Sequence, residues 1–215
     1  MSHRELLERE LRLFQLEVPI AQQVLLARYC DELERWNRRI NLTGLEGSER
    51  IRRLVVEPVW IAGRLEIQGR LVDIGSGNGS PAVPIHVVRS LDQVHLVEAR
   101  AKRAAFLRHV ISALNLSGAI VHRARFEELT EELSGADWVT LQGVALTDKL
   151  LDSMRRVAGK GTVAWITGET RASVPPSSSV RVPITGTQVF LFRLDRHAKT
   201  TESGTILQRE HDKGA

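Results

Sequence analysis

The chain has 215 residues, of which 42% are hydrophobic and 26% charged, and its formal net charge is +4. This composition is typical of one soluble globular domain with a small appendage. No window approaches the roughly 18 consecutive apolar residues of a membrane span, and the charged start lacks the apolar segment of a signal peptide. A single cysteine, Cys30, excludes an internal disulfide and a cysteine zinc cluster. We therefore expect a cytoplasmic protein.

The first part of the chain predicts amphipathic helices. Ser2 and Glu5 are spaced as a capping box ahead of an apolar helix face. After a break at Pro19, apolar residues spaced by three or four indicate a second helix: Leu25, Tyr29, Leu33, Trp36 and Ile40. We assign residues 1–67 to an N-terminal helical extension.

Arginine outnumbers lysine 25 to 5, and several arginines lie in this extension. The planar guanidinium suits contacts with phosphates and stacking on bases, although a GC-rich genome produces the same bias. Four side chains are candidate contacts to RNA, with a solvated helix face as the alternative: Arg35, Arg38, Arg39 and Arg53.

From residue 69 the pattern changes to strands that alternate with helices. In chain order we expect strand 70–74, helix 84–91, strand 93–97, helix 101–116, strand 119–122, strand 137–141, helix 147–157 and strand 162–166. This succession predicts a parallel sheet with right-handed crossovers.

The last part of the chain has a different character. Residues 180–184 and 188–194 predict an antiparallel pair across Thr185 and Gly186. Residues 196–215 are polar and are expected to form a disordered tail. An α/β domain therefore spans residues 68–195, between the helical extension and the tail.

The most informative stretch is RLVDIGSGNGSPAVPI, residues 70–85. Asp73 lies near the end of a strand, and Gly75, Gly77 and Gly79 follow at every second position before a predicted helix. Glycines in such a turn let the backbone approach a ligand closely. Glu98 follows the next strand, where a carboxylate can hold the diol of a ribose.

The acidic residues discriminate between cofactors. A carboxylate beside the glycine turn repels the pyrophosphate of a dinucleotide such as NAD, but it attracts the sulfonium and ammonium groups of S-adenosylmethionine. Phe126 and Glu127 follow the third strand, where an aromatic or acidic group can meet an adenine ring. The pattern therefore favours a methyltransferase, with an NAD-binding Rossmann protein as the alternative.

A resemblance rests on four segments in this order: YCDELERWNRRINLTGL, RLVDIGSGNGSPAVPI, VHLVEARAKRAAFLRHVISALNL and IVHRARFEEL. Its strongest matches are Trp36-Asn37 with Asn41-Leu42-Thr43, and the helix that carries Lys102-Arg103. Together these segments, which lie within residues 5–168, resemble the ribosomal RNA small-subunit methyltransferase G family, also called glucose-inhibited division protein B.

The resemblance implies a class I S-adenosylmethionine-dependent methyltransferase fold, which is Rossmann-like with a mostly parallel seven-stranded sheet. It also implies methylation of 16S ribosomal RNA in the 30S subunit, at N7 of a guanine in the decoding region. N7 carries a lone pair and no proton, so this methyl transfer needs neither a general base nor a covalent nucleophile, and we assign no catalytic residue. We expect a monomer that binds no metal and no membrane.

Roles for single residues follow from the same resemblance. The three glycines of the turn would line the methionine and ribose of the cofactor, Glu98 would hold the ribose, and Phe126 and Glu127 would flank the adenine. The full set of cofactor-binding candidates is Asp73, Gly75, Gly77, Gly79, Ser80, Glu98, Phe126, Glu127 and Gln142.

The sequence departs from the family pattern at polar positions. Ser80 stands where the family usually has Phe or Leu, Gln142 where it has Arg, and Thr167 where it has Lys. A family His and Asp are replaced in the segment from Arg53 to Pro58. Two alternatives therefore remain open: a diverged paralogue that binds S-adenosylmethionine but has lost or changed its RNA substrate, and a non-catalytic RNA-binding module.

Overall fold

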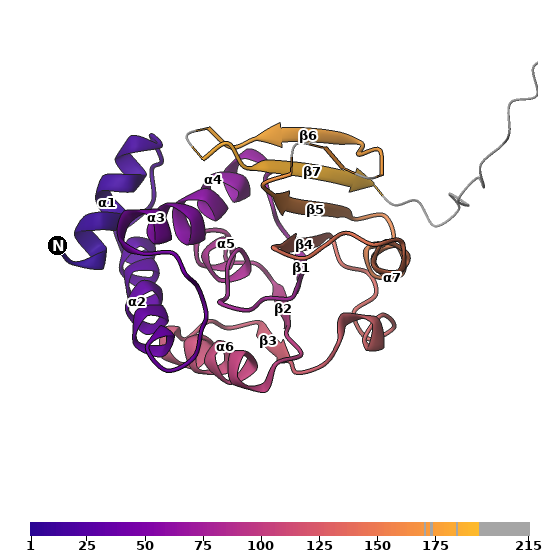
Figure 1. Ribbon diagram of the computed structural model, residues 1–215, viewed down its shortest axis with the longest axis horizontal. Helices are drawn as coiled ribbons and strands as arrows, with labels where there is room; N and C mark the ends of the chain where they lie inside the picture. Colours follow the sequence, from indigo (N-terminus) through magenta and orange to yellow (C-terminus); the bar gives the residue numbers. More distant parts are fainter. Residues whose placement is uncertain (170, 173, 184, 194–215) are drawn as a thin grey trace, which may run out of the picture.

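The computed structural model describes residues 1–193 except residues 170, 173 and 184, so the tail predicted at 196–215 lies outside the described residues. A sheet forms the centre of the molecule, with helices on both of its faces (Figure 1). The strands are β1 (Arg70–Ile74), β2 (Gln93–Val97), β3 (Ala119–His122), β4 (Trp138–Gln142), β5 (Thr162–Thr167), β6 (Ser178–Arg181) and β7 (Gln188–Arg193). The helices are α1 (His3–Leu13), α2 (Ile20–Asn37), α3 (Gly47–Ile51), the π-helical turn η1 (Arg52–Val56), α4 (Glu57–Arg64), α5 (Ala82–Arg89), α6 (Ala101–Leu114), the 3-10 turn η2 (Phe126–Glu128) and α7 (Asp148–Ala158).

The sheet has seven strands in the order β3-β2-β1-β4-β5-β7-β6. Strands β1 to β5 are parallel, whereas β7 runs antiparallel to both β5 and β6. This arrangement confirms the predicted α/β class with a mostly parallel seven-stranded sheet. The connections leave in opposite directions from β1 and from β4, and open sheets of this kind bind ligands beyond the carboxyl ends of the strands at that point.

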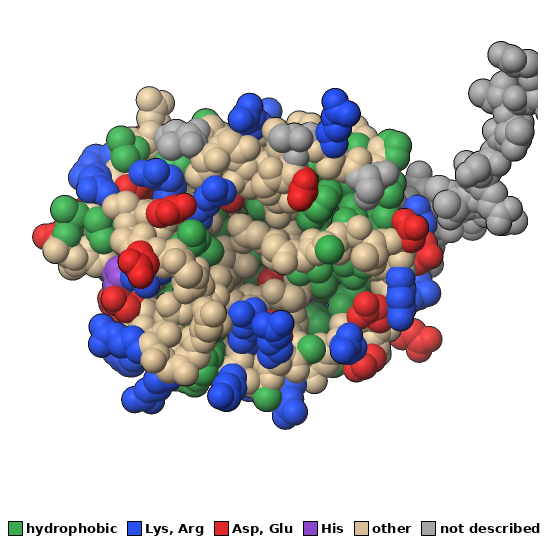
Figure 2. Space-filling model, viewed as in Figure 1, with side chains coloured by type: hydrophobic (Ala, Val, Ile, Leu, Met, Phe, Trp, Pro, Cys, Tyr) green, Lys and Arg blue, Asp and Glu red, His purple; other side chains and the backbone are tan. Residues whose placement is uncertain are grey.

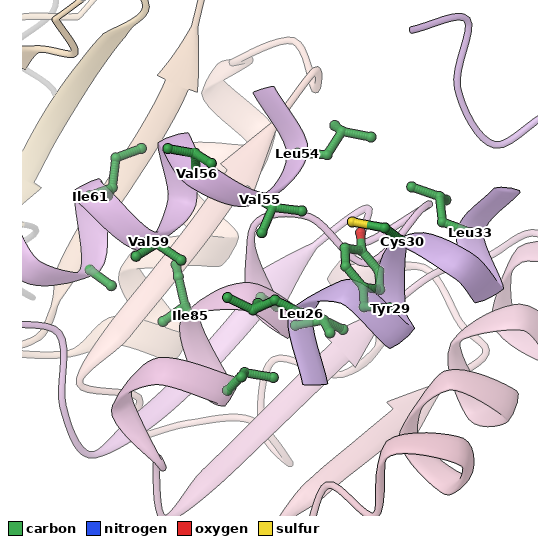
Figure 3. Close-up of a cluster of buried hydrophobic side chains, with 14 of the residues drawn as sticks. Leu26, Tyr29, Cys30, Leu33, Leu54, Val55, Val56, Val59, Ile61 and Ile85 are labelled. Atoms are coloured by element: carbon green, nitrogen blue, oxygen red, sulfur yellow. The ribbon is translucent and has the colours of Figure 1, made fainter. Parts of the chain in front are cut away.

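The two faces of the sheet bury separate hydrophobic clusters because successive strand residues point to opposite sides. Leu71 of β1 and Ile166 of β5 belong to the first cluster, which also contains side chains of α1 to α6. Figure 3 shows side chains of α2, η1, α4 and α5 meeting in this cluster. Val72 and Trp165, each one residue away in the chain, belong to the second cluster, which is covered by η2 and α7.

The predicted N-terminal helices are present and begin as the sequence indicates. Ser2 caps α1, since its hydroxyl accepts the N–H of Glu5 at 3.2 Å while the Glu5 carboxylate accepts the N–H of Ser2 at 2.7 Å. None of the described helices is both long enough and apolar enough to cross a membrane.

Several predicted boundaries shift by one to three residues. The helix expected at 84–91 begins at Ala82, because Pro84 falls in the first turn, where a missing N–H costs no helical hydrogen bond. The strand expected at 180–184 is Ser178–Arg181, since Val182 already belongs to the turn and donates its N–H to the carbonyl of Thr187 at 2.8 Å. Residue 184 of that expectation lies outside the described residues.

Candidate functional site

The glycine turn after β1 crosses the carboxyl end of β2. The N–H groups of Gly75 and Ser76 both donate to the carbonyl of Val97, at 2.9 and 3.0 Å. Gly75, Gly77 and Gly79 all have positive φ, at +69°, +45° and +92°. A side chain would strain this backbone, so the alternating glycines of the sequence are a requirement of the turn itself.

Gly79 has a second reason to be glycine, which is packing. A Cβ atom there would lie 3.1 Å from Val83, 3.4 Å from Tyr29 and 3.5 Å from Leu107. Tyr29 also donates its hydroxyl to the carbonyl of Asn78 at 2.8 Å. The side of Gly79 that would carry Cβ therefore faces α2, α5 and α6, and α2 of the extension holds the turn in place.

Glu98 is the carboxylate that fixes the turn to the end of β2. It is buried, and its two oxygens accept the N–H of Gly77 at 3.1 Å and the N–H of Arg100 at 2.7 Å. A carboxylate oxygen accepts more than one hydrogen bond, so each oxygen keeps capacity for a further donor. An immobilised carboxylate with spare acceptors at the end of β2 is what a ribose diol requires.

Asp73 lies beneath the turn and is 1% exposed. The Thr140 hydroxyl donates to its Oδ1 at 2.7 Å, while Oδ2 has no partner among the described residues. Burial raises the pKa of Asp73 to about 7, against the hydroxyls of Ser76 and Thr140, and the Glu98 carboxylate adds to the rise. Thr140 was not among the predicted site residues, since a threonine in a strand carries no functional signal.

Ser80 and Gln142 link the turn to the end of β4. The Ser80 hydroxyl donates to Oε1 of Gln142 at 3.2 Å, and the Ser80 N–H donates to Oδ1 of Asn78 at 3.0 Å. Both predicted residues therefore lie at the carboxyl ends of the central strands. Because Oε1 of Gln142 accepts the hydrogen bond from Ser80, the NH₂ group of the same amide remains available as a donor.

The two predicted adenine contacts after β3 are placed differently. Glu127 is exposed on η2, whereas the Phe126 ring is only 3% exposed and packs in the second hydrophobic cluster beside Val97 and Val139. The Phe126 ring therefore belongs to the core on this side of the sheet, and its contact with an adenine stays a prediction. Apolar residues next to a strand are often core residues, and the sequence alone did not separate the two roles.

The four predicted RNA-binding arginines do not act as one group. Arg35 of α2 pairs with Glu32 at 3.1 Å, and Arg38, the residue that caps the C-terminus of α2, pairs with Glu34 at 3.9 Å. Arg53 donates to the hydroxyl of Thr187 at 2.8 Å, so it tethers the turn before β7. Arg39 alone makes no ion pair with the residues described in the structure.

A hollow lies near the centre of the face in Figure 2, with Lys and Arg side chains along one side of it.

Within the described part of the chain, no three His, Cys, Asp or Glu residues gather into a group that could hold a metal ion. The chemistry available at the carboxyl edge of the sheet is therefore that of a glycine turn, two buried carboxylates and polar side chains.

This sheet order, with a glycine turn after β1 and a carboxylate after β2, defines a protein of the class I methyltransferase fold. Residues 22–174 match the family described as rRNA small subunit methyltransferase G. The match covers more than half of the chain, and the chain belongs to the rRNA small subunit methyltransferase G family, as the sequence motifs indicated.

Similar proteins agree with this membership. The ribosomal RNA small subunit methyltransferase G of Geobacter sp. (strain M21) is 34% identical over 140 residues, which are 64% of each chain. That of Chloroflexus aggregans is 41% identical over 109 residues, which are 50% of this chain and 46% of the relative. The matched segments thus span less than two thirds of the length of these relatives.

Solved structures show the same fold at low sequence identity. An RNA methyltransferase from Salinibacter ruber, in complex with S-adenosyl-L-homocysteine, matches with a TM-score of 0.54 at 14% identity, over 66% of this chain and 93% of that chain. A SAM-dependent methyltransferase from Aquifex aeolicus matches with a TM-score of 0.57 at 13% identity, over 75% and 98%.

Proposed function

We propose that this protein transfers a methyl group from S-adenosylmethionine to N7 of a guanine in 16S ribosomal RNA, in the decoding region of the 30S subunit. Family membership supports the class of reaction. The observation that carries the proposal is Glu98, which is anchored by two backbone N–H groups with acceptor capacity left over at the end of β2. A ribosomal substrate fits an activity in the cytoplasm, which we propose, and a monomer stays a prediction.

The acidic residues fit this cofactor better than a dinucleotide. Asp73 is buried with one unpartnered oxygen, and Glu98 lies against the same turn. A cationic ligand favours the ionised form of such a carboxylate, whereas a pyrophosphate would have to approach two acids. When bound, S-adenosylmethionine supplies a methyl group on a positively charged sulfur.

The side chains at the end of β4 have a positioning role in this proposal. Guanine presents O6 and N7 as neighbouring acceptors on its major-groove edge. Because Ser80 occupies Oε1 of Gln142, the Gln142 NH₂ can donate to O6 and leave the N7 lone pair free. No proton has to leave N7, so the residues need only bind, orient and exclude water.

The test is transfer of radiolabel from S-adenosylmethionine to 30S subunits from a strain that lacks the N7 methylation. We expect label in the small-subunit RNA, and none with the Gly75→Arg variant, in which a side chain is forced onto a positive-φ residue against Val144. Glu98→Gln is expected to weaken binding of S-adenosylhomocysteine by roughly tenfold or more, as for a lost charged hydrogen bond. Tighter binding of NAD than of S-adenosylhomocysteine would overturn the proposal.

The diverged-paralogue alternative is favoured by one observation. Gln142 is neutral where the family has an arginine, and its Oε1 accepts from Ser80, which stands where the family has an apolar residue. Saturable binding of S-adenosylhomocysteine without label on any RNA would identify such a paralogue. RNA binding without cofactor binding would identify a non-catalytic RNA-binding module.

A further inference from the structure

A basic pocket of about 460 Å³ lies where the end of α2 meets the start of α6. It is lined by Arg39, Ile40, Asn41, Arg100, Ala101, Lys102 and Arg103. Four of these seven residues carry a positive charge at neutral pH, and none of the seven is acidic.

The four cations of this basic pocket are not neutralised by the protein. Unlike Arg35 and Arg38, none of them forms an ion pair with a described residue. Arg103 donates to the backbone carbonyl of Asn41 at 3.1 Å, which joins the two walls of the pocket. The first turn of α6 holds no acidic residue either, although cations there are opposed by the helix dipole. A group of cations without carboxylate partners attracts anions to this part of the surface.

The basic pocket lies next to the glycine turn after β1. Nη1 of Arg103 is 3.4 Å from the point where a Cβ of Gly77 would lie, and Arg100 donates its N–H to Glu98. The side chains of Arg39, Arg100 and Lys102 are exposed, so the pocket is open to a large ligand. Cations from the turn after α2 and from the start of α6 match the repeated phosphates of a polynucleotide better than one small anion.

We propose that the basic pocket binds backbone phosphates of the RNA substrate and thereby sets the distance between the target base and the glycine turn after β1. The substrate class rests on the proposed function. Arg39 and Lys102 supply charge from opposite walls, and Arg103 couples the pocket to the turn. Contacts of this kind position an RNA without reading its sequence.

The test compares two double variants of the full chain that remove equal charge. Arg39→Gln with Lys102→Gln changes the basic pocket, whereas Arg4→Gln with Arg155→Gln removes two arginines outside it that already pair with Glu8 at 3.0 Å and with Asp152 at 2.6 Å. Fluorescence anisotropy with a labelled RNA hairpin of the decoding region gives the affinity at salt concentrations from about 50 to 200 mM. Titration with S-adenosylhomocysteine is expected to give the same affinity for both variants and the wild type.

The expected result is a smaller salt dependence for the pocket variant alone. The slope of log K against log salt should fall by roughly two, about one for each phosphate that the variant no longer binds. The control variant should keep the wild-type slope. Equal slopes for the two variants would overturn the proposal.

Two further outcomes are informative. The first distinguishes RNA phosphates from free phosphate as the ligand of the pocket, and the second distinguishes failure of the proposed function from failure of the pocket proposal. If the pocket variant loses binding of inorganic phosphate, followed by ³¹P line broadening, but keeps the wild-type RNA slope, the pocket binds free anions and the proposal is wrong. If the slope changes as expected while the wild type transfers no methyl group to 30S subunits, the proposed function fails and the phosphate pocket stands.

Discussion

Asp73 has one carboxylate oxygen bonded to Thr140 and the other unpartnered, in a buried position. Burial raises its pKa to about 7, so the folded state holds a proton that the unfolded state has lost at lower pH. Stability therefore falls as pH rises from about 4 to about 7, and the loss is complete above that range.

The Asp73→Asn variant tests this residue because it is neutral at every pH. We expect it to be more stable than the wild type at pH 8, by up to a few kcal/mol, and the difference to shrink towards pH 5. We also expect its affinity for S-adenosylmethionine at pH 8 to fall by roughly tenfold, because the variant offers the cation no negative charge. Urea unfolding and calorimetric titration measure the two effects, and a pH-independent stability difference would contradict the assigned pKa.

Gly79 allows packing and backbone strain to be separated. Gly79→Ala introduces a Cβ near Val83, Tyr29 and Leu107, whereas Gly135 also has positive φ, at +84°, but has open space around it. Gly135→Ala should therefore cost about 1 kcal/mol from strain alone. Gly79→Ala should cost about 1–3 kcal/mol more from overpacking. Equal losses in urea unfolding would show that the neighbours of Gly79 yield freely.

At the scale of elements, the Thr187 hydroxyl connects η1 and α4 to the start of β7. It accepts from Arg53 at 2.8 Å and donates to the buried carboxylate of Glu57 at 2.8 Å. Burial raises the pKa of Glu57, while hydrogen bonds from Thr185 and Thr187 and the charge of Arg53 oppose the rise. The hairpin β6–β7 is thus attached to η1 and α4 through Thr187, whose hydroxyl bonds to Arg53 and to the carboxylate of Glu57.

Thr187→Val removes this link, and we expect it to destabilise the fold by about 1–3 kcal/mol at neutral pH, because the buried carboxylate of Glu57 loses a hydrogen-bond donor. The loss should become smaller as the pH falls, because burial raises the pKa of Glu57 and the protonated carboxyl group depends less on an accepted hydrogen bond. Glu57→Gln is the partner variant of a double-mutant cycle. The effect of Thr187→Val should shrink in that background, and an undiminished effect would show that the hydroxyl acts through packing.

The order of elements was predictable, because each strand of the parallel part is a short apolar run and α6 has a regular apolar face. The turn residues Asp73, Gly77 and Glu98 were predictable for the same reason, since each lies at or just beyond the end of a strand. The contacts of Thr140 and Tyr29 with this turn were not. They join segments far apart in the sequence, and no local pattern specifies which distant side chain reaches a given atom.

At the scale of the whole molecule, the sequence boundary between residues 67 and 68 does not coincide with a boundary in the core. The first hydrophobic cluster joins α1 and α2 to strands β1, β2, β5 and β7 without interruption (Figure 3 shows part of it). Tyr29 of α2 also holds the glycine turn through Asn78. The helical extension and the sheet should therefore unfold together.

Four tryptophans allow this cooperativity to be measured in the full chain. Trp36 and Trp60 lie in the helical extension, whereas Trp138 and Trp165 lie on the sheet. A variant with Trp36→Phe and Trp60→Phe reports on the sheet by fluorescence, and one with Trp138→Phe and Trp165→Phe reports on the extension. Within each variant, the urea midpoint from fluorescence should equal the midpoint from far-ultraviolet circular dichroism, as two-state unfolding requires. In the Trp138→Phe, Trp165→Phe variant, a fluorescence midpoint at lower urea than the circular-dichroism midpoint would show that residues 1–67 unfold as a separate unit. In that case α2 would hold the glycine turn only loosely.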